Sequence, residues 1–244
     1  TAGDTLTRFD QSGASLNSVT VNGVEFTDAT VFASQLVVAV AGDQQGFSFR
    51  GLTTLSENLF VPTAFPVDSI NDGFGRLFIT SGETIYTFSV AGNEIASTRA
   101  ENTNQRFVDT ALRGTRLYIA QAGSSNEVRA LNPITLEEIA SFSLPFVIDS
   151  MAAGDNNDLF MTSGNSIFHY TTDGEVLGSI DGDADELFGD ITFAADPRPI
   201  AQGTVVAATT GVQQAVTRRN AETLADAGSF PVDADIDGIA VAGN

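Results

Sequence analysis

Six aspartates recur at nearly constant spacing along the 244-residue chain, each followed by small or apolar residues. Successive members lie 40, 41, 40, 41 and 43 residues apart, and the step from the last through both termini to the first is 39. Carboxylates that converge on one place raise one another's pKa unless a cation or hydrogen-bond donors intervene. Ca²⁺, with about six to eight oxygen ligands, suits such a set. The repeated aspartates are Asp28, Asp68, Asp109, Asp149, Asp190 and Asp233.

Two interpretations of this set of aspartates stay open. In the first, each carboxylate caps backbone N–H groups at a junction between repeats and acts as a brace. In the second, the carboxylates hold a cation, either as a binding site or as part of a calcium-assisted catalytic funnel. The brace is favoured, because a role repeated six times is typical of architecture.

A second acidic cluster lies in "DGDADELFGD" at 181–190, where Asp181, Asp183 and Asp185 alternate like the start of a calcium loop. The sixth position of an EF-hand loop would be Gly and the twelfth an acid, but Glu186 and Thr192 stand there. A solvated acidic loop is favoured over a surface calcium site. The single histidine, His169, is expected to be a partly exposed strand residue and not a general base.

Repeated phrases show which elements must position these residues. "RLFITSG" at 76–82 and "DLFMTSG" at 158–164 are nearly the same, and "RLYIAQAG" at 116–123 resembles both. Segments 2–16, 81–95 and 163–177 align without a gap as Gly, an alternating strand, a Gly turn and a second alternating strand. Alternation with β-branched and aromatic residues is the signature of strands, and a period near forty indicates one copied supersecondary unit.

The repeat predicts an all-β, six-bladed β-propeller with four strands per blade, forming a single domain over 1–244. Each aspartate would begin an innermost strand, so all six would line one mouth of the central channel. The expected blade units are approximately 18–57, 58–100, 101–143, 144–185, 186–229, and 230–244 together with 1–17.

The last blade is expected to be a composite of both termini, with its outer two strands from residues 2–16. Its register has two solutions. Either "GIAVAG" is the second strand and the blade has four strands, or "DGIAVAG" is the innermost strand, Asp237 replaces Asp233, and one strand is absent. The spacing favours Asp233. The fifth unit has an insertion, "AADPRPIAQG" at 194–203, where two prolines predict a loop.

Residues 116–145, "RLYIAQAGSSNEVRALNPITLEEIASFSLP", resemble the YVTN-type propeller repeat, and the other units are similar to NHL-like blades. The resemblance implies a propeller that is exported or on the cell surface, and it implies no particular chemistry. The absence of Trp excludes tryptophan–aspartate repeats, quinoprotein tryptophan motifs and sialidase aspartate boxes in their usual form.

The amino-acid composition limits the classes of partner that the chain is expected to bind. The net charge is −20, and all eleven basic residues are Arg, so neither nucleic acids nor anionic lipids are expected as partners, and membrane insertion is not expected. The chain starts without a basic-then-apolar segment, which suggests a processed, mature end. An acidic surface without Lys suggests a saline or marine environment. There is no Cys for disulfides or thiolate chemistry.

These observations favour a non-enzymatic, secreted or cell-surface module that binds a protein, a glycan or copies of itself. No catalytic residue and no certain cofactor is predicted. The alternative is a calcium-dependent lactonase-type hydrolase with Ca²⁺ in the channel, which would need several kinds of side chain at the channel mouth. A metal or a second subunit at that mouth would separate the two.

Overall fold

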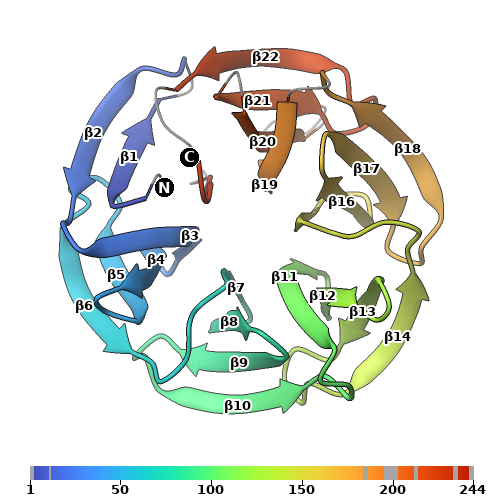
Figure 1. The fold of residues 1–244 in the computed structure, drawn as a ribbon, viewed down its shortest axis with the longest axis horizontal. Helices are drawn as coiled ribbons and strands as arrows, with labels where there is room; N and C mark the ends of the chain where they lie inside the picture. Colours follow the sequence, from blue (N-terminus) through green and yellow to red (C-terminus); the bar gives the residue numbers. More distant parts are fainter. Residues whose placement is uncertain are drawn as a thin grey trace.

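The computed structural model describes residues 3–10, 12–183, 186–194, 203–211, 214–232 and 236–241. These residues form 22 β-strands and no helix, and the sheets are arranged as a ring around a central axis (Figure 1). The β-propeller predicted from the sequence is therefore confirmed. No helix able to cross a membrane occurs in the described part of the chain.

Five sheets have four antiparallel strands each. The first contains β3 (Val24–Phe32), β4 (Gln35–Gly42), β5 (Gly46–Gly51) and β6 (Glu57–Pro62). The second contains β7 (Ser69–Gly73), β8 (Arg76–Ser81), β9 (Thr84–Ser89) and β10 (Glu94–Arg99). The third contains β11 (Gln105–Arg113), β12 (Arg116–Gly123), β13 (Glu127–Leu131) and β14 (Glu138–Ser143).

The fourth sheet contains β15 (Ser150–Ala153), β16 (Asp158–Ser163), β17 (Ser166–Thr171) and β18 (Val176–Asp181). The fifth contains β19 (Glu186–Ala194), β20 (Thr204–Gly211), β21 (Ala215–Asn220) and β22 (Asp226–Pro231). In each sheet the first strand faces the channel and the last forms the outer rim (Figure 1).

The core lies between adjacent blades. One cluster joins the first two sheets through Val37, Phe47, Ile70 and Leu77, which are at most 2% exposed. Middle strands such as β8 and β16 are buried on both faces, so three consecutive apolar residues stand in each instead of an alternating pattern. Packing of one blade on the next therefore holds the ring together without disulfides.

The blades alternate between two kinds. The inner strands β3, β11 and β19 have nine residues each. Their pairing with the next strand shifts register beside the regularly spaced aspartates Asp28, Asp109 and Asp190. The inner strands β7 and β15 have only five and four residues and no such shift. The true structural unit is thus a pair of blades, with Asp28, Asp109 and Asp190 spaced by 81 residues.

The sixth sector corrects the expectation of six four-stranded blades, because five such blades are present in the described residues. Here β1 (Thr5–Phe9) and β2 (Ser15–Thr20) form a two-stranded sheet, and residues 236–241 lie near the channel without strand pairing (Figure 1). Gly3 N–H donates to Asp237 Oδ2 at 2.7 Å and Gly3 O accepts from Phe26 N–H at 2.6 Å, which joins both ends of the described chain to the first blade.

Every outermost strand has a β-bulge at its second residue. The ladder skips Leu16, Asn58, Ile95, Ile139, Leu177 and Ala227. A bulge twists an edge strand away from flat pairing and so protects it against edge-to-edge association.

Candidate functional site

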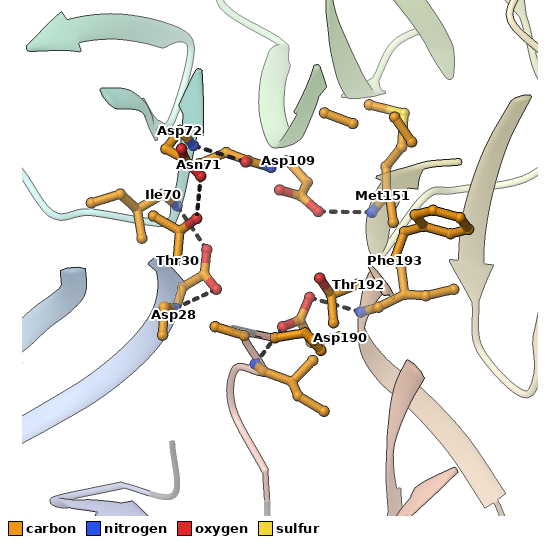
Figure 2. A pocket seen from close by; sticks show the side chains of 18 of the residues that line it. Asp28, Thr30, Ile70, Asn71, Asp72, Asp109, Met151, Asp190, Thr192 and Phe193 are labelled. Carbon is orange, nitrogen blue, oxygen red and sulfur yellow. Dashed lines mark hydrogen bonds between the residues drawn. The ribbon is translucent and has the colours of Figure 1, made fainter. Parts of the chain in front are cut away.

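A cavity of ≈ 220 Å³ opens at the channel, and three of the repeated aspartates line it. Asp28, Asp109 and Asp190 project from β3, β11 and β19 toward the channel axis (Figure 2). Asp68 and Asp149 are not among the lining residues. Only alternate members of the predicted ring therefore converge, which follows from the alternation of long and short inner strands.

Each of the three convergent carboxylates bridges its own blade to the next. Asp28 Oδ2 accepts from Ile70 N–H at 2.7 Å, and Asp109 Oδ2 accepts from Met151 N–H at 2.7 Å (Figure 2). Asp190 Oδ2 accepts from Ile239 N–H at 2.6 Å. The other oxygen of each carboxylate accepts from the N–H of the following residue, at 2.6 to 2.8 Å. All six oxygens thus have backbone donors.

The three channel carboxylates differ in the number of serine hydroxyls that contact them. Asp109 accepts from Ser69 Oγ at 2.6 Å and contacts Ser150 Oγ at 2.8 Å, and Asp190 contacts Ser150 Oγ at 2.7 Å. Asp28 lies between Gly238, which takes the position of Ser69 and Ser150, and Ser69 itself, whose hydroxyl donates to Asp109. The hydrogen bonds of Asp28 therefore come from the backbone N–H groups of Ala29 and Ile70. The one Ser150 hydroxyl proton serves only one carboxylate at a time, so the other contact is satisfied when that carboxyl is itself protonated and donates to Ser150 Oγ.

The pKa of each channel carboxyl depends on its burial, its charged neighbours and its hydrogen-bond donors. Burial, and then the charges of Asp190 and Asp109, raise the pKa of Asp28 well above its usual value. Burial and the charge of Asp109 raise the pKa of Asp190 to about 6. Burial also raises the pKa of Asp109, opposed by hydrogen bonds from Ser69, Met151, Ser150 and Thr110. The site can therefore hold protons near neutral pH, most readily on Asp28, which has the fewest donors.

The remaining predicted aspartates have a different role. Asp68 Oδ2 accepts from Gly82 N–H at 2.6 Å, and Asp149 Oδ2 accepts from Gly164 N–H at 2.7 Å. The equivalent bond in the sixth sector is made by Asp237 to Gly3. Asp233 lies outside the described residues, and Asp237 makes the interaction that the sequence spacing had favoured for Asp233.

Sequence reasoning missed Ser69, Ser150 and Asp72, and it considered Asp237 only as the alternative to Asp233. Asp72 lines the cavity and accepts from Thr30 Oγ1 at 3.0 Å, while burial raises its pKa. The signal for the serines was available in the Asp-Ser dipeptides at 68–69 and 149–150.

The second acidic cluster makes local contacts. Asp181 Oδ1 accepts from Ser166 Oγ at 2.6 Å, and the Asp183 backbone pairs with Glu186. Asp185 lies outside the described residues. Among the residues that are described, no three His, Cys, Asp or Glu side chains are placed to share a metal ion. Each oxygen of the three channel carboxylates accepts at least one hydrogen bond from the backbone.

His169 is buried, 6% exposed, which corrects the expectation of a partly exposed residue. Its Nε2 lies 2.8 Å from Asp158 Oδ2, and its ring stacks on Phe160. Alternation along β17 did place it opposite Phe168 and Tyr170, but a blade packs on both faces of this strand. The pair lies away from the channel cavity.

Comparison with known proteins supports the fold alone. No family model matches the sequence, and no curated protein matches it. A solved protein of unknown function from Bacteroides caccae has a TM-score of 0.63 at 10% identity, over 81% of this chain and 73% of that chain. A chain of the mitotic checkpoint complex has a TM-score of 0.66 at 12% identity, over 98% of this chain and 76% of that chain. At such identities the similarity carries no functional assignment.

Proposed function

We propose that this chain is a non-enzymatic binding or assembly module, secreted or on the cell surface, whose channel carboxylates are structural. The proposal rests on the backbone hydrogen bonds that the three convergent carboxylates accept. Both oxygens of Asp28, Asp109 and Asp190 accept backbone N–H groups from two neighbouring blades. A carboxylate engaged in this way has fewer free lone pairs for a substrate or a cation.

The outer rim offers a surface for partners. Four outermost strands place a large aliphatic side chain at the bulge, and these side chains are 46 to 53% exposed. They are Leu16, Ile95, Ile139 and Leu177. Repetition of an exposed apolar group around a rim supports contact with a protein, a glycan or another copy of the chain. The bulges at the same positions disfavour pairing through the rim strands themselves.

The surface charge and the resemblance of residues 116–145 to the YVTN-type repeat support the extracytoplasmic placement, in an environment of high salt. The alternative function, a calcium-dependent lactonase-type hydrolase, is favoured by one observation only, the convergence of three carboxylates on a cavity of ≈ 220 Å³. The backbone donors already occupy one lone pair of each carboxylate oxygen, so fewer lone pairs are left for Ca²⁺.

A calcium titration by calorimetry tests the proposal, with wild type and Asp109→Asn compared at pH 7.5. We expect no tight stoichiometric binding, and the same melting temperature with and without a chelator. Stoichiometric binding that Asp109→Asn abolishes would favour the hydrolase. In parallel, sedimentation of wild type and the double variant Ile95→Asp/Ile139→Asp tests self-association through the rim, because introduced charges weaken an apolar contact.

A further inference from the structure

A second cavity lies on the outer side of the first blade, and the residues that line it differ from those of the channel cavity. It has a volume of ≈ 270 Å³ and lies between the turn that joins β2 to β3 and the strands β4, β5 and β6. Pockets for drug-sized ligands begin at about 300 Å³, so this cavity suits a small molecule. Its polar wall consists of Asn22, Asp43, Gln44, Arg50 and Glu57.

Arg50 is the buried cation of this wall, with 4% exposure. Its Nε donates to Ser48 Oγ at 2.9 Å, its Nη1 to Leu55 O at 3.1 Å and its Nη2 to Glu57 Oε2 at 3.1 Å. A guanidinium has five N–H groups, so one on Nη1 and one on Nη2 have no acceptor among the described residues. Burial lowers the pKa of Arg50, opposed by the charge of Glu57, so a further acceptor would stabilise the charged form.

The third blade shows how the equivalent place is filled there by side chains. Val40 and Gln121 are equivalent, because each follows the residue that pairs with the channel aspartate of its blade. Gln121 is buried; its Oε1 accepts from Arg129 Nη1 at 3.4 Å, and its Nε2 donates to Glu127 Oε1 at 2.7 Å. The first blade has Gly46 in the place of Glu127. The cavity therefore lies where the third blade has an amide and a carboxylate.

Arg50 brings a guanidinium to this place from a different position of its strand. Ser48 is the equivalent of Arg129, and the contact of Arg50 with Ser48 Oγ places both guanidinium groups on the same face of their blades. Each also pairs with the rim carboxylate of its own blade, Arg50 with Glu57 and Arg129 with Glu138. In the third blade an amide oxygen is a further acceptor for the guanidinium, and in the first blade a ligand carboxylate can take that part.

The charges of the wall restrict the ligand further. Asp43 and Glu57 add two carboxylates beside Arg50, so the wall has a formal charge of −1, within a chain of −20. The chain would repel a ligand that is only an anion, whereas a ligand with an ammonium group as well can pair with Asp43. Asp43 is held against the β2–β3 turn, because its N–H donates to Gly23 O at 3.0 Å.

We propose that this cavity binds a free α-amino acid with an apolar side chain. The carboxylate accepts from the two remaining N–H groups of Arg50, and the ammonium group donates to Asp43. The inference goes beyond the proposed function and does not depend on self-association through the rim. The apolar wall, which would cover the ligand side chain, consists of Val21, Val24, Val40 and Phe60.

The test is an NMR titration of the isotope-labelled protein with L-leucine at pH 7.5. We expect saturable 1:1 binding with a Kd below about 1 mM, reported by the amides of Gly23 and Gln44 and by the Nε–H of Arg50. Two analogues each lack one charged group of leucine. 4-Methylpentanoate has no ammonium group and 3-methylbutylamine has no carboxylate, so each should bind at least about tenfold more weakly.

Two variants and one control examine the wall itself. Asp43→Asn changes an exposed side chain and should weaken leucine binding about tenfold, because it removes the charge that pairs with the ammonium group. Asp173→Asn removes an exposed carboxyl outside the cavity and should bind as wild type. Val40→Gln places the amide of the third blade in the cavity and should abolish binding. If Val40→Gln does not fold, Asp43→Asn and the two analogues still decide.

Several results would overturn the proposal. They are no saturable shift up to about 10 mM L-leucine, equal affinity for 4-methylpentanoate, or the same loss of affinity in Asp43→Asn and Asp173→Asn. Shifts confined to Ile239 and its neighbours would assign the ligand to the channel instead and would also overturn it. Self-association through the rim is measured separately with Ile95→Asp/Ile139→Asp, so failure here is distinguishable from failure of the proposed function.

Discussion

The channel carboxylates predict that the protein loses stability as the pH rises from about 4 to about 7. The pKa of Asp190 is about 6 in the folded protein against an ordinary value of 3.8. The folded state therefore keeps this proton to a higher pH than the unfolded chain. The contribution to stability is fully present below pH ~3.8 and is lost as the pH passes through about 6.

The magnitude follows from the difference between these two values. Each pKa unit corresponds to ~1.4 kcal/mol, so titration of Asp190 removes roughly 3 kcal/mol from the free energy of unfolding over this range. Asp28 and Asp109 also have raised pKa values and interact with Asp190, so the three carboxyls titrate together and the loss belongs to the cluster.

Asp190→Asn isolates the effect. Asparagine is neutral at every pH, so the stability of the variant relative to wild type should rise by about 2 to 3 kcal/mol between pH 4.5 and pH 7.5. Urea unfolding followed by circular dichroism measures this without the ionic screening that guanidinium adds. Asp173→Asn, which removes an exposed carboxyl, is the control and should give a curve parallel to wild type. A pH-independent difference between Asp190→Asn and wild type would refute the raised pKa.

Four further outcomes are expected. Asp109→Ala should lower the free energy of unfolding by about 2 to 4 kcal/mol with or without calcium, because it leaves buried backbone donors unsatisfied; an effect seen only with calcium present would contradict the brace. Gly238→Ala should cost ~1 to 3 kcal/mol, since its Cβ would lie 2.7 Å from Asp28 Cα, and an unchanged urea midpoint would show that the backbone yields there. Ser34→Gly should raise stability by about 0.5 to 1 kcal/mol because Ser34 has φ 62; a lower melting temperature would argue against strain at this turn. With a net charge of −20, the melting temperature should rise between low salt and roughly 1 M NaCl, and a flat profile would remove the saline interpretation.

The propeller fold was predictable because the alternation within strands and the repeat of about forty residues can be identified directly in the sequence. The register of the last repeat was not predictable, because the connection between β19 and β20 is longer than its equivalents. Nine residues separate β19 from β20, whereas two separate β3 from β4 and two separate β11 from β12. A step of 40 residues, as from Asp28 to Asp68 and from Asp109 to Asp149, would place the next aspartate at 230, and the seven extra residues move this position to 237. The nearly constant spacing had favoured Asp233 instead.

The candidate site was predictable in composition but not in geometry. Spacing identified Asp28, Asp109 and Asp190 together with Asp68 and Asp149 as one class. The difference between them arises from strand length and register at the channel, where β3, β11 and β19 carry a shift that β7 and β15 lack. Similarly, His169 looked like a surface residue because alternation distinguishes two faces of a strand and does not reveal that both faces are covered.

The pairing of blades into two kinds restricts how such rings can evolve by duplication. Each blade of the β3 kind has a carboxylate that accepts a backbone N–H of a following blade of the β7 kind, as Asp28 accepts from Ile70. A ring that grew by one blade would place two like blades side by side and leave either a carboxylate without its amide or an amide without its carboxylate. Growth by whole pairs avoids this defect, so relatives that keep the bridge should have an even number of sectors.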